Sequence, residues 1–221
     1  MSSPGRRWIV SIVAPRALAP RAALAALIAL ASLALPARPA RPSSTGPNPG
    51  LTGAPALGPF PAEPNCTSCH ASSPLNPDAR GSVRLEGLPE RYAPGQRYAL
   101  AFEVRHPDPD RQRWGFQVTA VAQGSGLGAG ELVVTDPADT QRIESSTTQR
   151  QYLEHTADGT GMGETGGHRW EFAWVAPASD VGDVAFYGAG NAANLDGSKE
   201  GDLIFDPAPE PLAVVHGPGT R

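Results

Sequence analysis

The chain has 221 residues, which is enough for one domain of ordinary size with a buried core. It contains 25 glycines and 24 prolines while lysine is nearly absent, a balance that favours a turn-rich β protein over a helical bundle. The formal net charge is −4 at pH 7 and about −8 without the first 37 residues, which disfavours nucleic acid or anionic lipid as a main ligand.

Residues 1–37 are predicted to be a signal peptide. Four arginines make this leader basic, residues 22–35 are apolar apart from Ser32, and we expect cleavage near Ala37 or Ala40. The run is too short to span a bilayer comfortably, so no stable membrane insertion is expected after cleavage; an uncleaved anchor is the alternative. Without the leader, 14 basic residues face 22 acidic ones, which indicates an acidic exported protein, periplasmic or extracellular.

Two segments follow that lack a periodic apolar pattern. Residues 38–64 are rich in Pro, Gly, Ser and Ala and are predicted to be a linker or a coil laid over the domain surface. Residues 65–80 hold both cysteines of the chain, Cys66 and Cys69, in loop-like sequence. At the far end, residues 207–221 are predicted to be a disordered tail.

Residues 81–206 have the pattern of β-strands. Apolar and polar side chains alternate most clearly in residues 97–105 and 168–175, and Gly, Pro and Asp bound the segments as turn residues. The strand-like segments are residues 81–89, 94–106, 113–122, 130–136, 140–147, 150–156, 168–177, 182–194 and 201–207.

This pattern predicts an all-β fold. About eight strands at spacings of about ten residues, without a helical period, are typical of an immunoglobulin-like β-sandwich. The two cysteines are not placed to join its sheets, so aromatic packing must replace a disulfide. We therefore expect Trp114, Trp170 and Trp174 in the core rather than in a carbohydrate-binding platform.

Several motifs carry a resemblance to a known family. Gly115–Gln117 ("GFQ"), residues 154–156 ("EHT") and residues 188–194 ("GAGNAAN") are similar to those of bacterial exported reelin-domain-like (Reeler-like, "choice-of-anchor" type) proteins. The resemblance extends over about residues 50–205. It implies a β-sandwich, often preceded by a C-x-x-C-H segment, and implies little about activity.

The segment "CTSCH", residues 66–70, matches a haem-attachment motif. Two thiols at this spacing reach the two vinyl groups on one edge of a haem, and the next histidine ligates the iron. The sequence therefore predicts one covalent haem c, bound through Cys66 and Cys69, with His70 as the proximal ligand. Export agrees with this prediction, because bacteria attach c-type haem outside the cytoplasm.

Other readings of the two cysteines are possible. A redox disulfide needs a thioredoxin-like setting, and a structural zinc site needs further ligands, neither of which is visible. A plain disulfide between Cys66 and Cys69 remains the main alternative, since the expected compartment is oxidising.

The second axial ligand is less clearly marked. His155 is the favoured candidate, because a strand there runs into a long Gly-rich loop; a purely structural His155 is the alternative. Met162, in that loop, is a weaker candidate. His106 is expected to be a solvated turn residue, His168 a strand-edge residue, and His216 a tail residue. Asp196 with Asn191 and Asn194 offers only a weak calcium site, since such clusters usually form turns.

Together these features predict an exported monohaem cytochrome-like protein. It would transfer electrons or sense redox state with an unidentified redox partner protein, and it is not expected to be an enzyme. The alternative is an extracellular binding or adhesion module, with a structural haem or a Cys66–Cys69 disulfide and with function in its loops.

Overall fold

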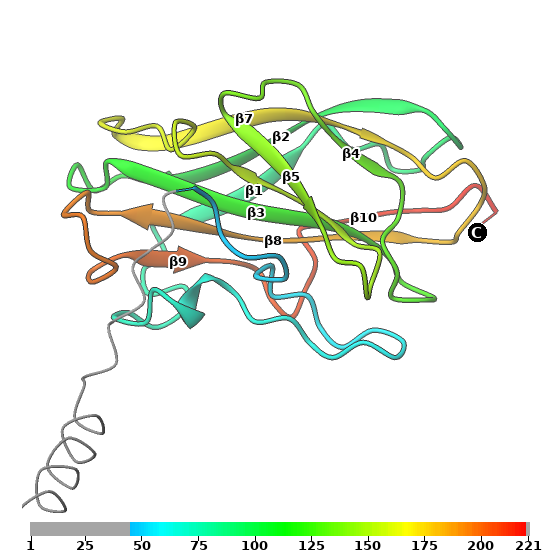
Figure 1. Ribbon diagram of the computed structural model, residues 1–221, viewed down its shortest axis with the longest axis horizontal. Helices are drawn as coiled ribbons and strands as arrows, with labels where there is room; N and C mark the ends of the chain where they lie inside the picture. The colour runs from blue at the N-terminus through cyan, green and yellow to red at the C-terminus, as the bar shows by residue number, and fades with distance from the viewer. Residues whose placement is uncertain (1–44, 220–221) are drawn as a thin grey trace, which may run out of the picture. The chain divides into compact units, whose positions relative to one another are not determined.

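A computed structural model describes residues 45–219, so the predicted signal peptide lies outside the described residues. The described chain is all β apart from one short 3-10 turn, η1 (Cys66–Ser68). Its strands form two antiparallel sheets packed face to face, which confirms the predicted β-sandwich (Figure 1). Residues 45–219 include no helix with the length and apolar character needed to cross a bilayer.

The smaller sheet has four strands in the order β1-β2-β7-β4. Its members are β1 (Ser82–Glu86), β2 (Arg97–His106), β7 (Gly166–Val175) and β4 (Glu131–Val134). β2 and β7 pair along their whole length, from Arg97 opposite Val175 to His106 opposite Gly166. These two long strands are the two segments in which the sequence alternates most clearly.

The larger sheet has six strands in the order β10-β8-β3-β6-β5, with β9 also paired to β8. Its members are β3 (Arg113–Ala122), β5 (Thr140–Glu144), β6 (Gln151–His155), β8 (Val184–Ala193), β9 (Leu203–Phe205) and β10 (Ala213–Val215). β3 and β8 are its long central pair. The two long pairs make the frame on which the shorter strands and the loops rest.

Aromatic side chains fill the space between the sheets. Trp114, Trp170 and Trp174 are at most 1% exposed, so the prediction that they form the core is confirmed. Phe116 stacks on Trp170 at a centroid distance of 4.4 Å. Each indole nitrogen donates to a backbone carbonyl; that of Trp170, for example, lies 2.6 Å from the oxygen of Gly159. The core thus buries large apolar rings while it satisfies their polar atoms.

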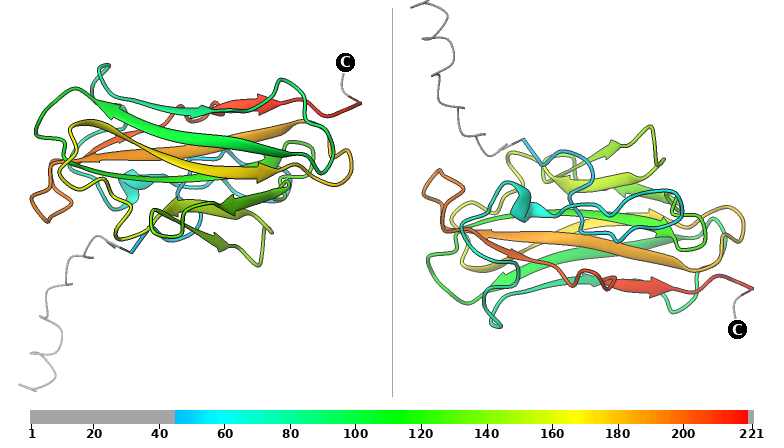
Figure 2. Two further views of the ribbon diagram at one scale, coloured as in Figure 1. Left: turned by 90° about the horizontal axis from the view of Figure 1, so that it is seen from above. Right: turned by 90° about the horizontal axis from the view of Figure 1, so that it is seen from below.

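Residues 45–80, which we call the strap, cover the outer face of the larger sheet. Figure 2 (right) shows this blue-to-cyan segment running across β8 and β3. Ala54 and Leu57 pack on Val121 and Tyr187 of those strands. The strap and the sandwich belong to one compact unit. In residues 45–64, the described part of the predicted linker, the chain is therefore a packed layer.

The end of the chain differs from the sequence prediction. A disordered tail was expected from residue 207, but β10 pairs with β8, and the tail continues as a bridge between Arg91 and His216. The backbone of His216 exchanges two hydrogen bonds with the Glu90–Tyr92 segment. The prediction is wrong for residues 207–219, because the free edge of β8 offers pairing that a three-residue strand accepts without any periodic signal of its own.

Candidate functional site

The two cysteines and His70 lie in a single tight turn. Asn65 caps this turn: its side-chain oxygen accepts hydrogen bonds from the backbone and the hydroxyl of Thr67, at 3.0 and 2.6 Å. The backbone nitrogens of Cys69 and His70 both donate to the carbonyl of Cys66, at 3.2 and 3.0 Å. These local hydrogen bonds form a turn that holds two thiols and one imidazole close together.

The two thiols have different surroundings. Both are free, and Cys69 is exposed whereas Cys66 is buried. Cys66 packs against Ala189 of β8 and Ile204 of β9, with Leu75 of the strap beside it. Burial raises the pKa of the Cys66 thiol from 9.0 to about 12, and the nearby carboxylate of Asp206 adds to the rise. In this conformation Cys66 is a packed apolar side chain rather than a nucleophile.

His70 is held by a carboxylate from a distant part of the chain. Its Nδ1 lies 2.6 Å from Oδ2 of Asp202, at the start of β9, and the Asn191 amide lies 3.3 Å from the same oxygen. Metal-binding histidines commonly have one ring nitrogen engaged in this way, which orients the ring and leaves the other nitrogen for the metal. The sequence analysis did not find Asp202, because nothing in the sequence connects residues 132 positions apart.

The "AGNAAN" motif on β8 has a clear role beneath the strap. Ala189 is fully buried against Cys66, and a larger side chain there would keep the turn from approaching the sheet. Asn191, two residues along the same face, reaches His70 and Asp202. Its side-chain oxygen is buried with no hydrogen-bond partner among residues 45–219. The motif thus seats the Cys66–His70 turn.

His155 ends β6 on the same sheet. Its Nδ1 lies 3.1 Å from the backbone nitrogen of Phe116 and 3.2 Å from the oxygen, and its ring fills the space above Gly115. Burial is the main cause that lowers its pKa from 6.5 to about 4; the hydrogen bond to Phe116 opposes this, and nearby positive charges, that of His70 included, add to it. His155 is therefore a neutral imidazole at neutral pH.

The other candidate ligands are spread over the sandwich. Met162 is 63% exposed. His168 packs edge-on against Trp170 and bonds to Glu164 at 2.7 Å, and His216 lies 3.2 Å from Asp183. None of these three is placed by a contact at the Cys66–His70 turn.

His106 does not match its prediction. It was expected to be a solvated turn histidine, but it is fully buried. Its ring stacks on Phe205, its Nε2 lies 3.3 Å from Asp78, and its Nδ1 accepts the backbone N–H of Asp108. The following prolines end β2, yet the strap folds over this end and covers the ring.

The weak calcium candidate forms turns. The side chain of Asn194 bonds to Asp196 at 3.2 Å, and Asp196 accepts the backbone N–H of Ser198 at 2.8 Å. Across residues 45–219 no group of three or more His, Cys, Asp or Glu side chains is arranged to hold a metal ion. The oxygens of Asn194 and Asp196 are therefore occupied within their own loop, while Asn191 lies on β8 beside His70.

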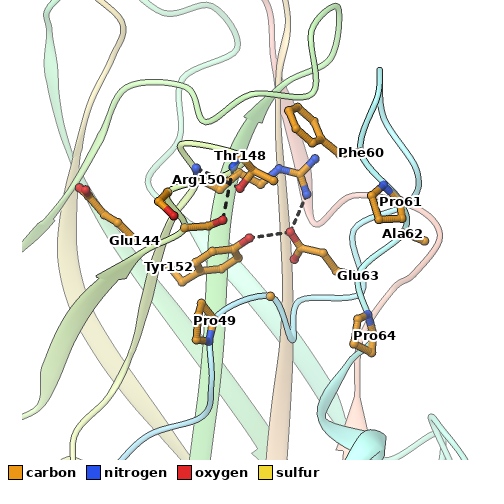
Figure 3. Close-up of a pocket in the computed structure, with 13 residues that line it drawn as sticks. Pro49, Phe60, Pro61, Ala62, Glu63, Pro64, Glu144, Thr148, Arg150 and Tyr152 are labelled. Atoms are coloured by element: carbon orange, nitrogen blue, oxygen red, sulfur yellow. Dashed lines mark hydrogen bonds and ion pairs between the residues drawn. The ribbon is translucent and has the colours of Figure 1, made fainter.

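A second polar cluster joins the strap to β6. Glu63 contacts Arg150 and Tyr152 beside a cavity of 480 Å³, which the strap lines on one side and residues 144–152 on the other (Figure 3). The sequence analysis missed this cluster, since a lone Arg next to a strand normally indicates a solvated residue.

The donor set at the turn can be compared with what a c-type haem needs. Two reduced thiols at the correct spacing, the exposure of Cys69, and the engaged Nδ1 of His70 all fit. The burial of Cys66 does not fit such an attachment, because the docked strap packs this residue against Ala189 and Ile204.

Comparisons with known proteins find only distant likenesses among solved structures. No family model and no curated protein match the chain. Among solved structures, the human F-spondin reeler domain is 20% identical, with 62% of this chain and 88% of that one covered and a TM-score of 0.43. The Reelin-N domain of F-spondin is 20% identical, with 68% of this chain and 95% of that one covered and a TM-score of 0.43. The major pilin SpaD of Corynebacterium diphtheriae is 11% identical, with 57% of this chain and 33% of that one covered and a TM-score of 0.38. We assign no function from likenesses at this level.

Proposed function

We propose that this chain is an exported β-sandwich protein that carries one covalent haem c on the Cys66–His70 turn and serves electron transfer or redox sensing. The observation that carries the proposal is the pairing of His70 with Asp202 beside two unpaired thiols. Other histidines of the domain, such as His106 and His168, also pair with carboxylates, so the pairing supports the proposal through its position beside both thiols.

The chain's own groups supply the attachment chemistry. Each thiol adds across one vinyl double bond of the porphyrin: sulfur bonds to one carbon, the thiol proton goes to the other, and no oxidant or reductant is consumed. When bound, the haem supplies a one-electron iron couple. The role of Cys66 and Cys69 is to hold that couple at one place on the sheet.

His70 is the proposed proximal ligand and Asp202 its positioning residue. The bond from Nδ1 to the carboxylate leaves Nε2 with its lone pair and makes the imidazole more basic. A more basic ligand stabilises oxidised iron, so this pair is expected to lower the reduction potential.

His155 is the proposed second ligand. In the tautomer in which its Nδ1 donates to the carbonyl of Phe116, 3.2 Å away, Nε2 carries the lone pair. The lowered pKa keeps the ring neutral and therefore able to coordinate metal at neutral pH. Met162 is the weaker alternative, because its exposure leaves it without a fixed position.

The test is expression with a cytochrome c maturation system. We expect a coloured protein with a pyridine haemochrome spectrum and a denatured mass that is greater by one haem. Cys66→Ala with Cys69→Ala should abolish the covalent mass increase, and Asp202→Asn should keep it while shifting the reduction potential upward. A colourless wild-type protein with the mass of its amino acids would refute the proposal.

A second candidate function is an extracellular binding or adhesion module. The cavity between the strap and residues 144–152 favours it, because it places Phe60 and Tyr152 beside proline side chains in a concave surface (Figure 3). In that case the turn would be structural. A colourless protein that binds a ligand, with Tyr152→Ala reducing the affinity, would favour this function over the first.

A further inference from the structure

The strap is fixed to the sandwich by a buried ion pair just ahead of the cysteine turn. The guanidinium of Arg150 is fully buried and lies 2.5 Å from Oε1 of Glu63 (Figure 3). The same oxygen accepts the hydroxyl of Tyr152 at 2.7 Å, and the other accepts that of Thr52 at 2.5 Å. Arg150 also donates twice to the carbonyl of Gly126. We call the Glu63–Arg150 pair the latch.

The latch has only two favourable states. With the strap docked, both charges are paired and their remaining polar atoms are satisfied. With the strap lifted, water solvates both. A partly lifted strap would leave Arg150 buried without its partner, which is strongly unfavourable. The latch therefore makes docking close to all-or-none.

Further polar anchors hold the strap on both sides of Cys66. Asp206, after β9, accepts the Asn65 side chain at 2.7 Å, and its backbone carbonyl accepts that of Asn76 at 2.7 Å. Gly201 donates to the hydroxyl of Ser72 at 2.7 Å. Cys66 thus lies between two fixed points, pressed onto Ala189. With Cys66 only 9% exposed, its sulfur is shielded from molecules that approach from solvent while both points hold.

Cys69 is in a different position. It lies three residues further along the same turn and is exposed with the strap docked. Docking of the strap therefore buries the thiol of Cys66 and leaves the thiol of Cys69 exposed.

We propose that the latch regulates the attachment site, so that haem is joined to Cys66 only while the strap is undocked. In a chain whose strap docks first, the Cys66 thiol does not react with haem. The part of this inference that concerns haem rests on the proposed function. The closure of Cys66 by the strap does not depend on that function. Attachment at Cys66 must then precede the docking of the strap.

Thiol labelling tests the closure without any haem. The reduced protein is prepared without maturation factors as Cys69→Ser, which reports Cys66, and as Cys66→Ser, which reports Cys69. Iodoacetamide labelling is followed by mass. We expect native Cys66 to react about 100-fold or more slowly than Cys69, and equally fast in urea, because both burial and the raised thiol pKa suppress its thiolate. Equal native rates would overturn the inference.

Breaking the latch should open the site. Glu63→Ala is expected to speed native Cys66 labelling by about 10-fold or more through local opening. The matched control is Glu131→Ala, which removes an exposed partner of Arg142 on the same domain. If Glu63→Ala fails to fold, as judged by circular dichroism, then Glu63→Gln is used, which keeps hydrogen bonding but removes the charge. A Cys66 rate unchanged in the folded variant would contradict the latch.

A second experiment, in which haem is added, tests this inference separately from the proposed function. Folded, reduced wild type and Glu63→Ala are incubated with dithionite-reduced haem, and covalent mass and thioether number are measured. We expect wild type to gain no bond at Cys66 and the variant to gain one. If co-expression loads haem but folded wild type also forms both thioethers, the inference fails and the proposed function stands. If neither route loads haem, the proposed function fails, and the labelling result alone decides whether the strap closes Cys66.

Discussion

The two faces of the larger sheet are buried in different ways. The inner face packs large rings, such as Phe116 and Phe186, against the tryptophans of the smaller sheet. The outer face, beneath the strap, buries small side chains such as Ala185 and Ala189 together with the polar Gln117 and Glu154. Apolar contact is non-directional, so the inner face sets stability, while hydrogen-bonded polar groups on the outer face set where the strap lies.

This difference predicts two levels of cooperativity. The inner core joins both sheets and should unfold only with the whole domain. The strap rests on one surface through two small apolar clusters and a few polar anchors and should open at lower cost. The following experiments test that contrast.

Trp170→Ala should give the largest effect. Trp170 is fully buried, stacks on Phe116 and bonds to Gly159, so its removal leaves a large cavity and an unpaired carbonyl. We expect a loss of about 3–5 kcal/mol in the free energy of unfolding, measured by urea denaturation. Trp170→Phe should lose less. A loss under about 1 kcal/mol would mean that the core can collapse around the site.

Glu154 should make stability depend on pH. Burial raises its pKa from 4.5 to about 7, so between these values the native state keeps a proton that the unfolded state releases. Its contribution to the free energy of unfolding therefore falls as the pH rises from about 5 to 7 and stays low above, by at most about 3 kcal/mol.

The measurement is the stability difference between Glu154→Gln and wild type. The contribution of His155 to the pH dependence of stability has the opposite sign, because its lowered pKa makes the native state gain stability as the pH rises from about 4 to 6.5. The dependence of wild-type stability on pH is therefore ambiguous by itself. Urea midpoints at pH 5 and pH 8 should show the variant gaining on wild type at the higher pH. An identical difference at both values would show that Glu154 is solvated.

Ala189→Leu tests the outer face alone. The larger side chain should displace Cys66 and Leu75 and destabilise the docked strap by about 1–3 kcal/mol. Hydrogen exchange should quicken at the backbone amides of Gly53 and Glu63, which bond within the strap, but not in β2 or β7. Ala99→Leu is the control, on the uncovered outer face of the smaller sheet. Uniform acceleration throughout the domain would show that strap and core are a single cooperative unit.

Met162→Ala should have the smallest effect. The side chain is 63% exposed, so we expect a change within about 0.5 kcal/mol in the urea-derived free energy of unfolding. In the haem-loaded protein the absorption spectrum should be unchanged, whereas His155→Ala should alter the low-spin bands. The reverse pattern would assign the second ligand to Met162.

The sequence was informative where a local pattern carries the structure. Alternation with period two predicted the long strands and the buried tryptophans, because a strand with one buried face repeats apolar residues at every second position. The short strand β10 has three residues and no such repeat, so the ordered tail was missed. His106 was misplaced for a related reason, since its burial depends on what covers a strand end.

The candidate site also combines features that the sequence predicts with contacts that only the fold shows. The sequence by itself determined the strands and the close spacing of Cys66, Cys69 and His70, because each depends on neighbours along the chain. Only the tertiary structure decided that Asp202 orients His70, that Glu63 meets Arg150 87 residues away, and that one thiol is closed while the other is open. Such contacts form between segments that share no periodicity, and they depend on which surface the folded sheet presents to the strap.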